Sequence, residues 1–143
     1  MASAEHTSSI HIDAPVEKVF QYAEDPAHFI AAMPEEIHST LGAVNRTPDG
    51  VVTDYEYQYR DLGLHLSAVF TREEYVVNER IVDRSSVGVV FTFSVEADDG
   101  GTKLTASWDA STLMKMLDAA FFHGDRHVEH ALTRYKAEIE ALA

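Results

Sequence analysis

The amino-acid sequence predicts an α+β fold that combines an antiparallel sheet of about seven strands with two short helices and one long C-terminal helix. Seven segments either alternate apolar with polar residues or are rich in β-branched and aromatic residues, as strands are. Most connections between neighbouring strand segments are short, which favours antiparallel pairing. The last part of the chain instead carries apolar residues at helical spacing.

The order of the predicted elements follows from these periodicities and from the turn residues between them. The elements are strand 5–12, helix 15–23, a short helix near 26–33, strands near 37–46, 51–60, 63–75, 79–86, 89–97 and 102–110, and a helix from about 113 to 142. Turn-forming residues separate three of the strand pairs, at Pro48-Asp49-Gly50, Asp61-Leu62-Gly63 and Asp98-Asp99-Gly100-Gly101.

The first strand and the first helix are predicted from a compact set of signals. Ile10 and Ile12 alternate with polar neighbours, as in a half-buried strand. We expect Asp13 to cap the helix that follows, with Pro15 in its first turn, where proline is tolerated. Pro26 predicts a helix boundary at the residue before it.

Length and composition indicate one globular domain spanning residues 1–143. The chain has no cysteine, which excludes disulfides, thiol catalysis and cysteine-ligated zinc. It has 24 acidic and 11 basic residues, and the formal net charge of -13 repels nucleic-acid phosphates and anionic membranes. We therefore expect no nucleic-acid partner. No run approaches the ~18 apolar residues of a membrane span, so we also expect no membrane insertion. We expect a cytoplasmic protein that is a monomer or a homodimer.

Several short motifs occur in a recognisable order along nearly the whole chain. They are Ile10-x-Ile12-x-Ala14-Pro15-x-Glu17-x-Val19-Phe20, Asp25-Pro26, Asn78-Glu79-Arg80-Ile81-Val82, Phe91-Thr92-Phe93, Gly100-Gly101-Thr102-Lys103-Leu104 and Leu132-Thr133-Arg134-Tyr135-Lys136. This order resembles the START-like (SRPBCC) superfamily, which includes polyketide cyclases/dehydrases, lipid-transport proteins and pollen-allergen-like proteins. The resemblance implies a helix-grip fold, in which the curved sheet wraps around the long C-terminal helix and the two short helices close one end. Such a fold usually leaves an elongated pocket between sheet and helix.

Alternating strand positions indicate which side chains line that pocket. Tyr55, Tyr57 and Tyr59 share one strand face, which must look inward because the other face carries charged and polar residues. A plain aromatic core is the alternative, but phenol hydroxyls need partners when buried, which suits an amphipathic cavity better. The predicted ligand-binding residues are Tyr55, Tyr57, Tyr59, Leu66, Phe70, Phe91, Phe93, Trp108 and Phe121. On the C-terminal helix, the predicted inward stripe is Leu113, Leu117, Ala120, Phe121, Gly124, Val128, Ala131, Leu132, Tyr135 and Ile139.

Candidate acid–base groups are the tyrosines together with Asp83, Arg72, His65 and His123. If Ile81 points inward, Asp83 does too, and a buried aspartate requires a partner such as Arg72. Val82 is an equally good candidate for the inward face, and if Val82 points inward, Asp83 points outward. Both orientations of Asp83 therefore stay open. No residue set matches a cyclase signature, so no catalytic residue is assigned and enzymatic activity stays undecided.

A histidine cluster near the start of the last helix has a spacing that can chelate a metal ion. His123 and His127 stand four residues apart on one helical face, with His130 nearby. The glutamate that follows the first histidine in a zinc-protease motif is missing, and Gly124 weakens the helix there. We interpret the cluster as solvated or pocket-edge histidines, and predict no metal site and no cofactor.

Three functions are compatible with the sequence. The first is binding of a hydrophobic or aromatic small molecule or lipid in the internal pocket. The second is a polyketide aromatase/cyclase or dehydratase that uses the same pocket. The third is a protein-interaction module, chaperone-activator-like or toxin-like, whose acidic convex face meets a basic partner. We favour the first.

Overall fold

A computed structural model describes residues 6–32, 38–61, 64–86, 88–110 and 124–142. Its elements are β1 (His6–Ile12), α1 (Val16–Ala23), α2 (Pro26–Ala31), β2 (Thr40–Arg46), β3 (Val52–Asp61), β4 (Leu64–Val76), β5 (Arg80–Ser85), β6 (Val89–Asp98), β7 (Gly101–Ala110) and α4 (Gly124–Leu142). The predicted α+β class and the order of elements are confirmed.

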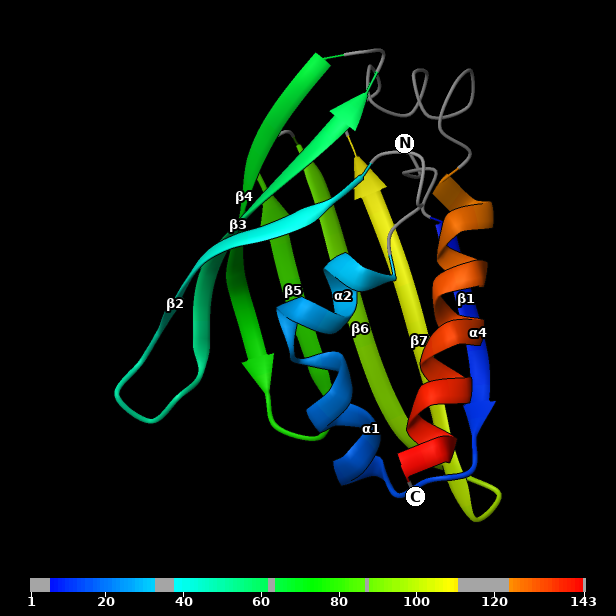
Figure 1. Ribbon diagram of the computed structural model, residues 1–143. Helices are drawn as coiled ribbons and strands as arrows, with labels where there is room; N and C mark the ends of the chain where they lie inside the picture. The colour runs from blue at the N-terminus through cyan, green and yellow to red at the C-terminus, as the bar shows by residue number, and fades with distance from the viewer. Residues whose placement is uncertain (1–5, 33–37, 62–63, 87, 111–123, 143) are drawn as a thin grey trace, which may run out of the picture.

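All seven strands form one antiparallel sheet in the order β1-β7-β6-β5-β4-β3-β2. The sheet is strongly curved, and α1, α2 and α4 lie on its concave side (Figure 1). Helix α4 runs along β1 and β7, while the short helices stand in front of the middle strands. This arrangement is a helix-grip fold. Among the described helices, none is long and apolar enough to cross a membrane.

The entry into α1 differs from the prediction. Pro15 is the N-cap residue rather than part of the first turn, and its carbonyl accepts from Lys18 N and Val19 N. The expectation that Asp13 caps this helix is wrong, because α1 has no side-chain cap and the Asp13 carboxylate instead contacts His11 Nε2 at 2.9 Å. The boundary at Asp25 is confirmed, since its side chain accepts from Ala27 N at the start of α2.

Most strand boundaries agree with the prediction to within about one residue, with β2 as the exception. A strand was expected from residue 37, but β2 begins at Thr40. His38 has φ 48°, a left-handed conformation that interrupts an extended chain. The predicted last helix is described from Gly124 onward, and residues 113–123 lie outside the described part of the chain.

A β-bulge in β4 changes which side chains of that strand face the core. The register with β5 shifts between Arg72 and Glu74, so that one residue of β4 has no counterpart. Before the bulge, Phe70 is fully buried on the concave side, and after it Tyr75 packs against the same core. Without the bulge, Tyr75 would face outward, because side chains alternate strictly along a regular strand.

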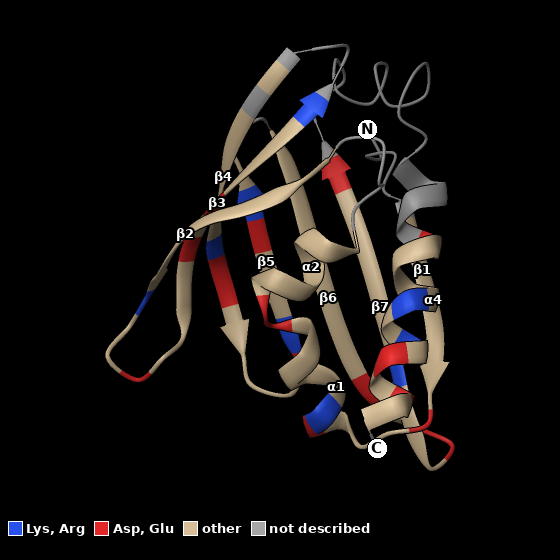
Figure 2. Cartoon of the chain, in the orientation of Figure 1, with Lys and Arg blue, Asp and Glu red and all other residues tan. Residues whose placement is uncertain are grey.

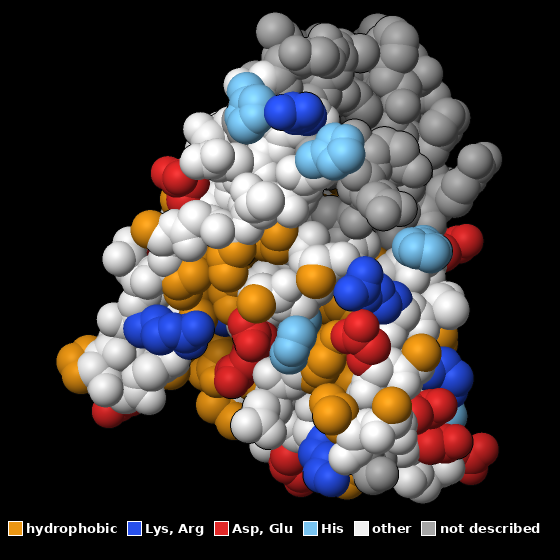
Figure 3. All heavy atoms as spheres, viewed as in Figure 1, with side chains coloured by type: hydrophobic (Ala, Val, Ile, Leu, Met, Phe, Trp, Pro, Cys, Tyr) orange, Lys and Arg blue, Asp and Glu red, His pale blue; other side chains and the backbone are white. Residues whose placement is uncertain are grey.

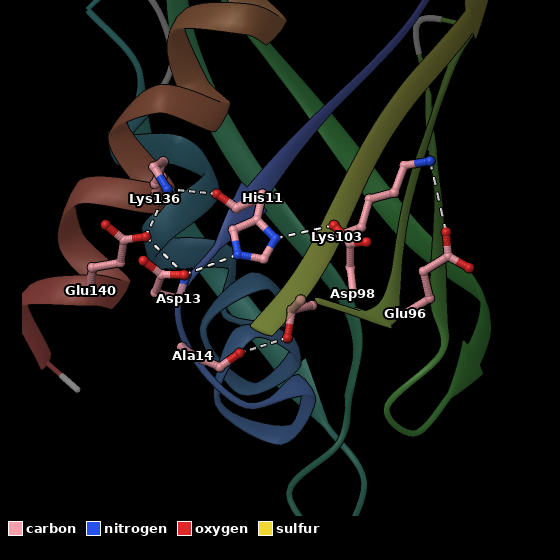
Figure 4. A network of polar contacts seen from close by, with 9 residues as sticks. His11, Asp13, Ala14, Glu96, Asp98, Lys103, Lys136 and Glu140 are labelled. Atoms are coloured by element: carbon pink, nitrogen blue, oxygen red, sulfur yellow. Dashed lines mark hydrogen bonds and ion pairs between the residues drawn. The ribbon is translucent and has the colours of Figure 1, made fainter. Parts of the chain in front are cut away.

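The C-terminal half of α4 is held to β1 by polar contacts at one corner of the fold (Figure 4). Lys136 Nζ donates to the His11 carbonyl and to Glu140, each at 2.7 Å. Glu140 in turn accepts from Asp13 N at 2.9 Å. The His11 ring bridges Asp98 and Asp13, and these hydrogen bonds raise the pKa of His11 above its usual value. This corner therefore fixes α4 against the edge of the sheet.

Candidate ligand site

Among the described residues, one buried charged centre lies on the concave face of the sheet. On β5, Ile81, Asp83 and Ser85 alternate inward, and Asp83 is 5% exposed. The orientation that the sequence left open is therefore the inward one. Acidic and basic positions stand side by side on the neighbouring strands β4 and β5 (Figure 2). Arg72 lies directly opposite Asp83 in the register and is its ion-pair partner.

The Asp83 carboxylate is held by three hydrogen bonds. Arg72 Nε donates to Oδ1 at 2.9 Å and Nη2 to Oδ2 at 3.1 Å, while the Tyr55 hydroxyl donates to Oδ2 at 3.0 Å. The remaining Arg72 nitrogen, Nη1, donates to the Glu24 carbonyl at 3.1 Å, which ties the end of α1 to the sheet. With both side chains less than a tenth exposed, the pair is a desolvated, bidentate salt bridge.

Burial and the charge pair set the protonation states of this centre. Burial, followed by the Asp83 charge, raises the pKa of Tyr55 well above its usual value, so the phenol stays protonated and donates. Burial alone lowers the pKa of Arg72, but the hydrogen bond and the charge of Asp83 raise it above its ordinary value. The centre consequently holds a fixed cation, its carboxylate and a neutral phenol.

Beside the charged centre lies a continuous aromatic surface on β3, β4 and β6. The Tyr57 ring stacks on Tyr59 with centroids 5.2 Å apart and on Phe70 at 5.1 Å. Burial, followed by the neighbouring Tyr59, raises the pKa of Tyr57 to about 12. Tyr57 is 7% exposed, whereas Tyr59 and Phe91 are only partly buried. The aromatic surface is thus buried at Tyr57 and partly exposed to solvent at Tyr59 and Phe91.

Two aromatic residues of the short helices, neither of which was predicted as a site residue, complete this surface. Phe29 of α2 meets Phe91 edge-on at 5.1 Å and Phe93 at 5.9 Å. The ring of Tyr22 in α1 meets the ring of Tyr135 in α4 edge-on, with centroids 5.0 Å apart. The Tyr22 hydroxyl donates a hydrogen bond to the Glu138 carboxylate. The available signal was helical spacing of apolar residues, since Tyr22 stands three residues after Val19 and Phe29 stands three residues after Pro26.

The other predicted site residues lie in four different surroundings. Trp108 is 5% exposed and pairs in register with Phe91, so it belongs to the same face. His65 is exposed on the outer face of β4, away from the charged centre. The Leu66 side chain lies outside the described part of the structure, as do Phe121, His123 and the His127 side chain. Of the helix stripe, Leu132, Tyr135 and Ile139 are buried and Ala131 is partly buried.

Two of the hollows in the described part of the structure are lined by residues other than the predicted aromatic set. One of about 350 Å³ lies between β1 and α4; its lining residues are Ser8, Ser9, Ile10, Glu129, Leu132 and Thr133. The other, of about 190 Å³, is a polar cleft that reaches Arg72 from outside; its lining residues are Gln21, Glu24, Asp25, Arg46, Gly50, Val52 and Arg72. Hydrophobic side chains also show at the surface between the β2–β3 arm and helices α1 and α2 (Figure 3). Within the described ranges, no group of three or more His, Asp or Glu residues is placed to hold a metal ion.

The buried ion pair and aromatic surface occur in a chain that matches a known family over residues 3–143. That family is described as polyketide cyclase / dehydrase and lipid transport. The chain belongs to this family. A comparison with curated proteins gives no match.

Solved structures share the fold at low sequence identity. Protein Ms6760 from Mycobacterium smegmatis has a TM-score of 0.73 at 14% identity, covering 99% of this chain and 94% of that one. TTHA0849 from Thermus thermophilus has a TM-score of 0.70 at 16% identity, covering 97% and 99%. An AHSA1-like protein from Aeromonas hydrophila has a TM-score of 0.63 at 16% identity, covering 96% and 93%. The fold is thus shared by chains that differ from this one at most positions.

Proposed function

We propose that this protein of the polyketide cyclase/dehydrase and lipid-transport family binds a hydrophobic or aromatic small molecule or lipid. The ligand lies between the concave face of the sheet and α4. The observation that carries the proposal is the aromatic stack that runs from buried Phe70 through Tyr57 to Tyr59, which is only partly buried. A flat apolar ligand that covers Tyr59 and Phe91 removes their remaining apolar surface from water.

The β1–α4 hollow gives the proposal a second support. Leu132 and Ile10 contribute apolar surface to it, and it opens between the helix and the edge strand of the sheet. Its volume of about 350 Å³ is comparable with the lower end of small-molecule pockets, roughly 300 Å³. Helix and sheet therefore do not close on each other along their full length.

Substitution of Tyr59 tests the proposal. Tyr59→Ala removes a ring that is only partly buried; losing its stacking costs about 0.5–1.5 kcal/mol beyond the area that the ring buries, and circular dichroism checks that the variant is folded. We expect its affinity for 2-ethylnaphthalene, measured by calorimetric titration, to fall at least about tenfold. The matched control is Val69→Ala on the exposed outer face of β4, which leaves binding unchanged. Equal affinities of Tyr59→Ala and wild type would contradict the proposal.

A cyclase or dehydratase reaction in the same pocket is the second candidate, and the buried ion pair favours it. A fixed guanidinium and a neutral phenol beside an apolar surface are suited to polarising a carbonyl and moving a proton. If the protein is such an enzyme, Tyr55→Phe abolishes turnover of poly-ketone substrates while their binding persists. A wild-type protein that binds these substrates without converting them argues against this candidate.

A further inference from the structure

The hydroxyl of Tyr135 is distinguished from the other buried phenols of the site. Tyr135 is 1% exposed, yet its hydroxyl has no hydrogen-bond partner among the residues that the structure describes. Tyr55, by contrast, donates to Asp83, and Tyr57 is hydrogen-bonded to Ser85. A buried donor without an acceptor destabilises a protein, so such groups are rare and need an explanation.

The contacts of the Tyr135 ring place the residue between the aromatic surface and the charged centre. The ring belongs to α4 and stacks on Phe93 of the aromatic surface, with centroids 5.8 Å apart and an angle of 18° between the planes. Asp83 and Tyr135 are close enough to interact electrostatically, as are Tyr135 and Tyr55. The hydroxyl therefore lies on the helix side of the site, where the aromatic surface meets the charged centre.

The charged centre does not supply the missing acceptor. Both oxygens of Asp83 accept from Arg72 and one of them also accepts from Tyr55, but neither accepts a hydrogen bond from Tyr135. Burial, and after it the charge of Asp25, raises the pKa of Tyr135 above its usual range, so the phenol keeps its proton at all ordinary pH values. Tyr135 thus offers a permanent donor at the boundary of an otherwise apolar surface.

We propose that the Tyr135 hydroxyl selects, among apolar ligands of this site, those that carry a hydrogen-bond-accepting oxygen. The inference rests on the proposed ligand-binding function and adds the specificity of the site. An acceptor oxygen pairs with the Tyr135 donor, whereas a hydrocarbon of the same shape leaves it unpaired. Sites built around a buried hydrogen bond discriminate strongly against analogues that lack the partner group.

A matched pair of probes tests the inference. The compounds 2-acetylnaphthalene and 2-ethylnaphthalene have the same ring system, and only the first carries a carbonyl oxygen. We expect Tyr135→Phe to lower the affinity for 2-acetylnaphthalene about tenfold, the effect of losing one buried hydrogen bond. The affinity for 2-ethylnaphthalene stays within about twofold, because Phe retains the ring that contacts Phe93. Tyr57→Phe is the control, since that hydroxyl already has Ser85 as its partner and its loss does not separate the two probes.

The outcomes separate the inference from the proposed function. If wild type binds neither probe, the ligand-binding function fails and the inference fails with it. If wild type binds both and Tyr135→Phe changes both affinities equally, the inference fails while the binding site stands. Urea unfolding provides an independent readout: Tyr135→Phe is expected to be at least as stable as wild type. A destabilisation as large as that of Tyr55→Phe would show that the hydroxyl already has a partner in the free protein, which would overturn the inference.

Discussion

Removing the negative charge of Asp83 should destabilise the fold strongly, although Asn is nearly the same size. In Asp83→Asn, the Arg72 guanidinium stays buried, with a side chain only 4% exposed, and loses its anion. Breaking a buried ion pair by removing one partner typically costs about 3–5 kcal/mol. The amide oxygen of Asn still accepts one hydrogen bond, so we expect a loss near the lower end, about 3 kcal/mol. That is a large fraction of a domain's stability of roughly 5–15 kcal/mol.

Urea unfolding monitored by circular dichroism measures this loss directly. In thermal unfolding, the melting temperature of Asp83→Asn should fall by about 10 °C, because a loss of 1 kcal/mol lowers it by a few degrees in a domain of this size. The matched control is Glu73→Gln, which removes the carboxylate of an exposed ion pair with Arg84 on the same two strands. Its expected effect is below about 1 kcal/mol. If Asp83→Asn costs no more than Glu73→Gln, the ion pair is not the desolvated centre inferred above.

A double substitution distinguishes the lost charge from general disruption of the core. Arg72→Met combined with Asp83→Leu removes both charges and leaves apolar side chains of similar length. Replacing a whole buried pair in this way is often neutral or stabilising. The double variant should therefore be more stable than Asp83→Asn alone. A double variant that is less stable than the single one would show that packing, not the unpaired guanidinium, causes the loss.

Two further predictions concern the corner where β1, β7 and α4 meet. Gly101→Ala should destabilise the protein by about 1–3 kcal/mol, because an added Cβ would clash with the Ile12 carbonyl oxygen of β1; unchanged urea unfolding would refute the close approach. His11→Gln should reduce stability most below pH 6.5. Because Asp98 and Asp13 raise the pKa of His11, its stabilisation is complete below the unfolded value of 6.5 and is lost as the pH rises through the folded value. Melting temperatures from pH 5 to 9 test this against His65→Gln; a constant difference between wild type and His11→Gln would contradict it.

The sheet was predictable because its strands carry clear local signals. Tyr55, Tyr57 and Tyr59 alternate with charged and polar residues, and the structure puts them on the concave face in that phase. The family motifs and the turn residues then fixed the order of elements. The β4 bulge was not predictable, because residues around Glu73 show no break in the strand pattern. The bulge depends on contacts with other parts of the fold: it lets Tyr75 pack against the core while Arg72 still pairs with Asp83.

The candidate site was predictable in part, for a similar reason. Val82 is as apolar as Ile81, so periodicity alone left two orientations for Asp83, and only pairing with β4 decides between them. Phe29 and Tyr22 reach the site from helices whose placement over the sheet depends on long-range contacts. The Asp13 cap failed because a competing partner from β1, His11, binds its carboxylate.

Mapping a bound probe by NMR shows directly where on the protein a ligand binds. Intermolecular nuclear Overhauser effects between 2-acetylnaphthalene and the protein report which side chains the ligand touches. We expect contacts with the rings of Tyr57, Tyr59 and Phe91 on the concave face of the sheet. Contacts only with exposed residues such as Val69 and Val77, or no saturable contacts at all, would contradict it.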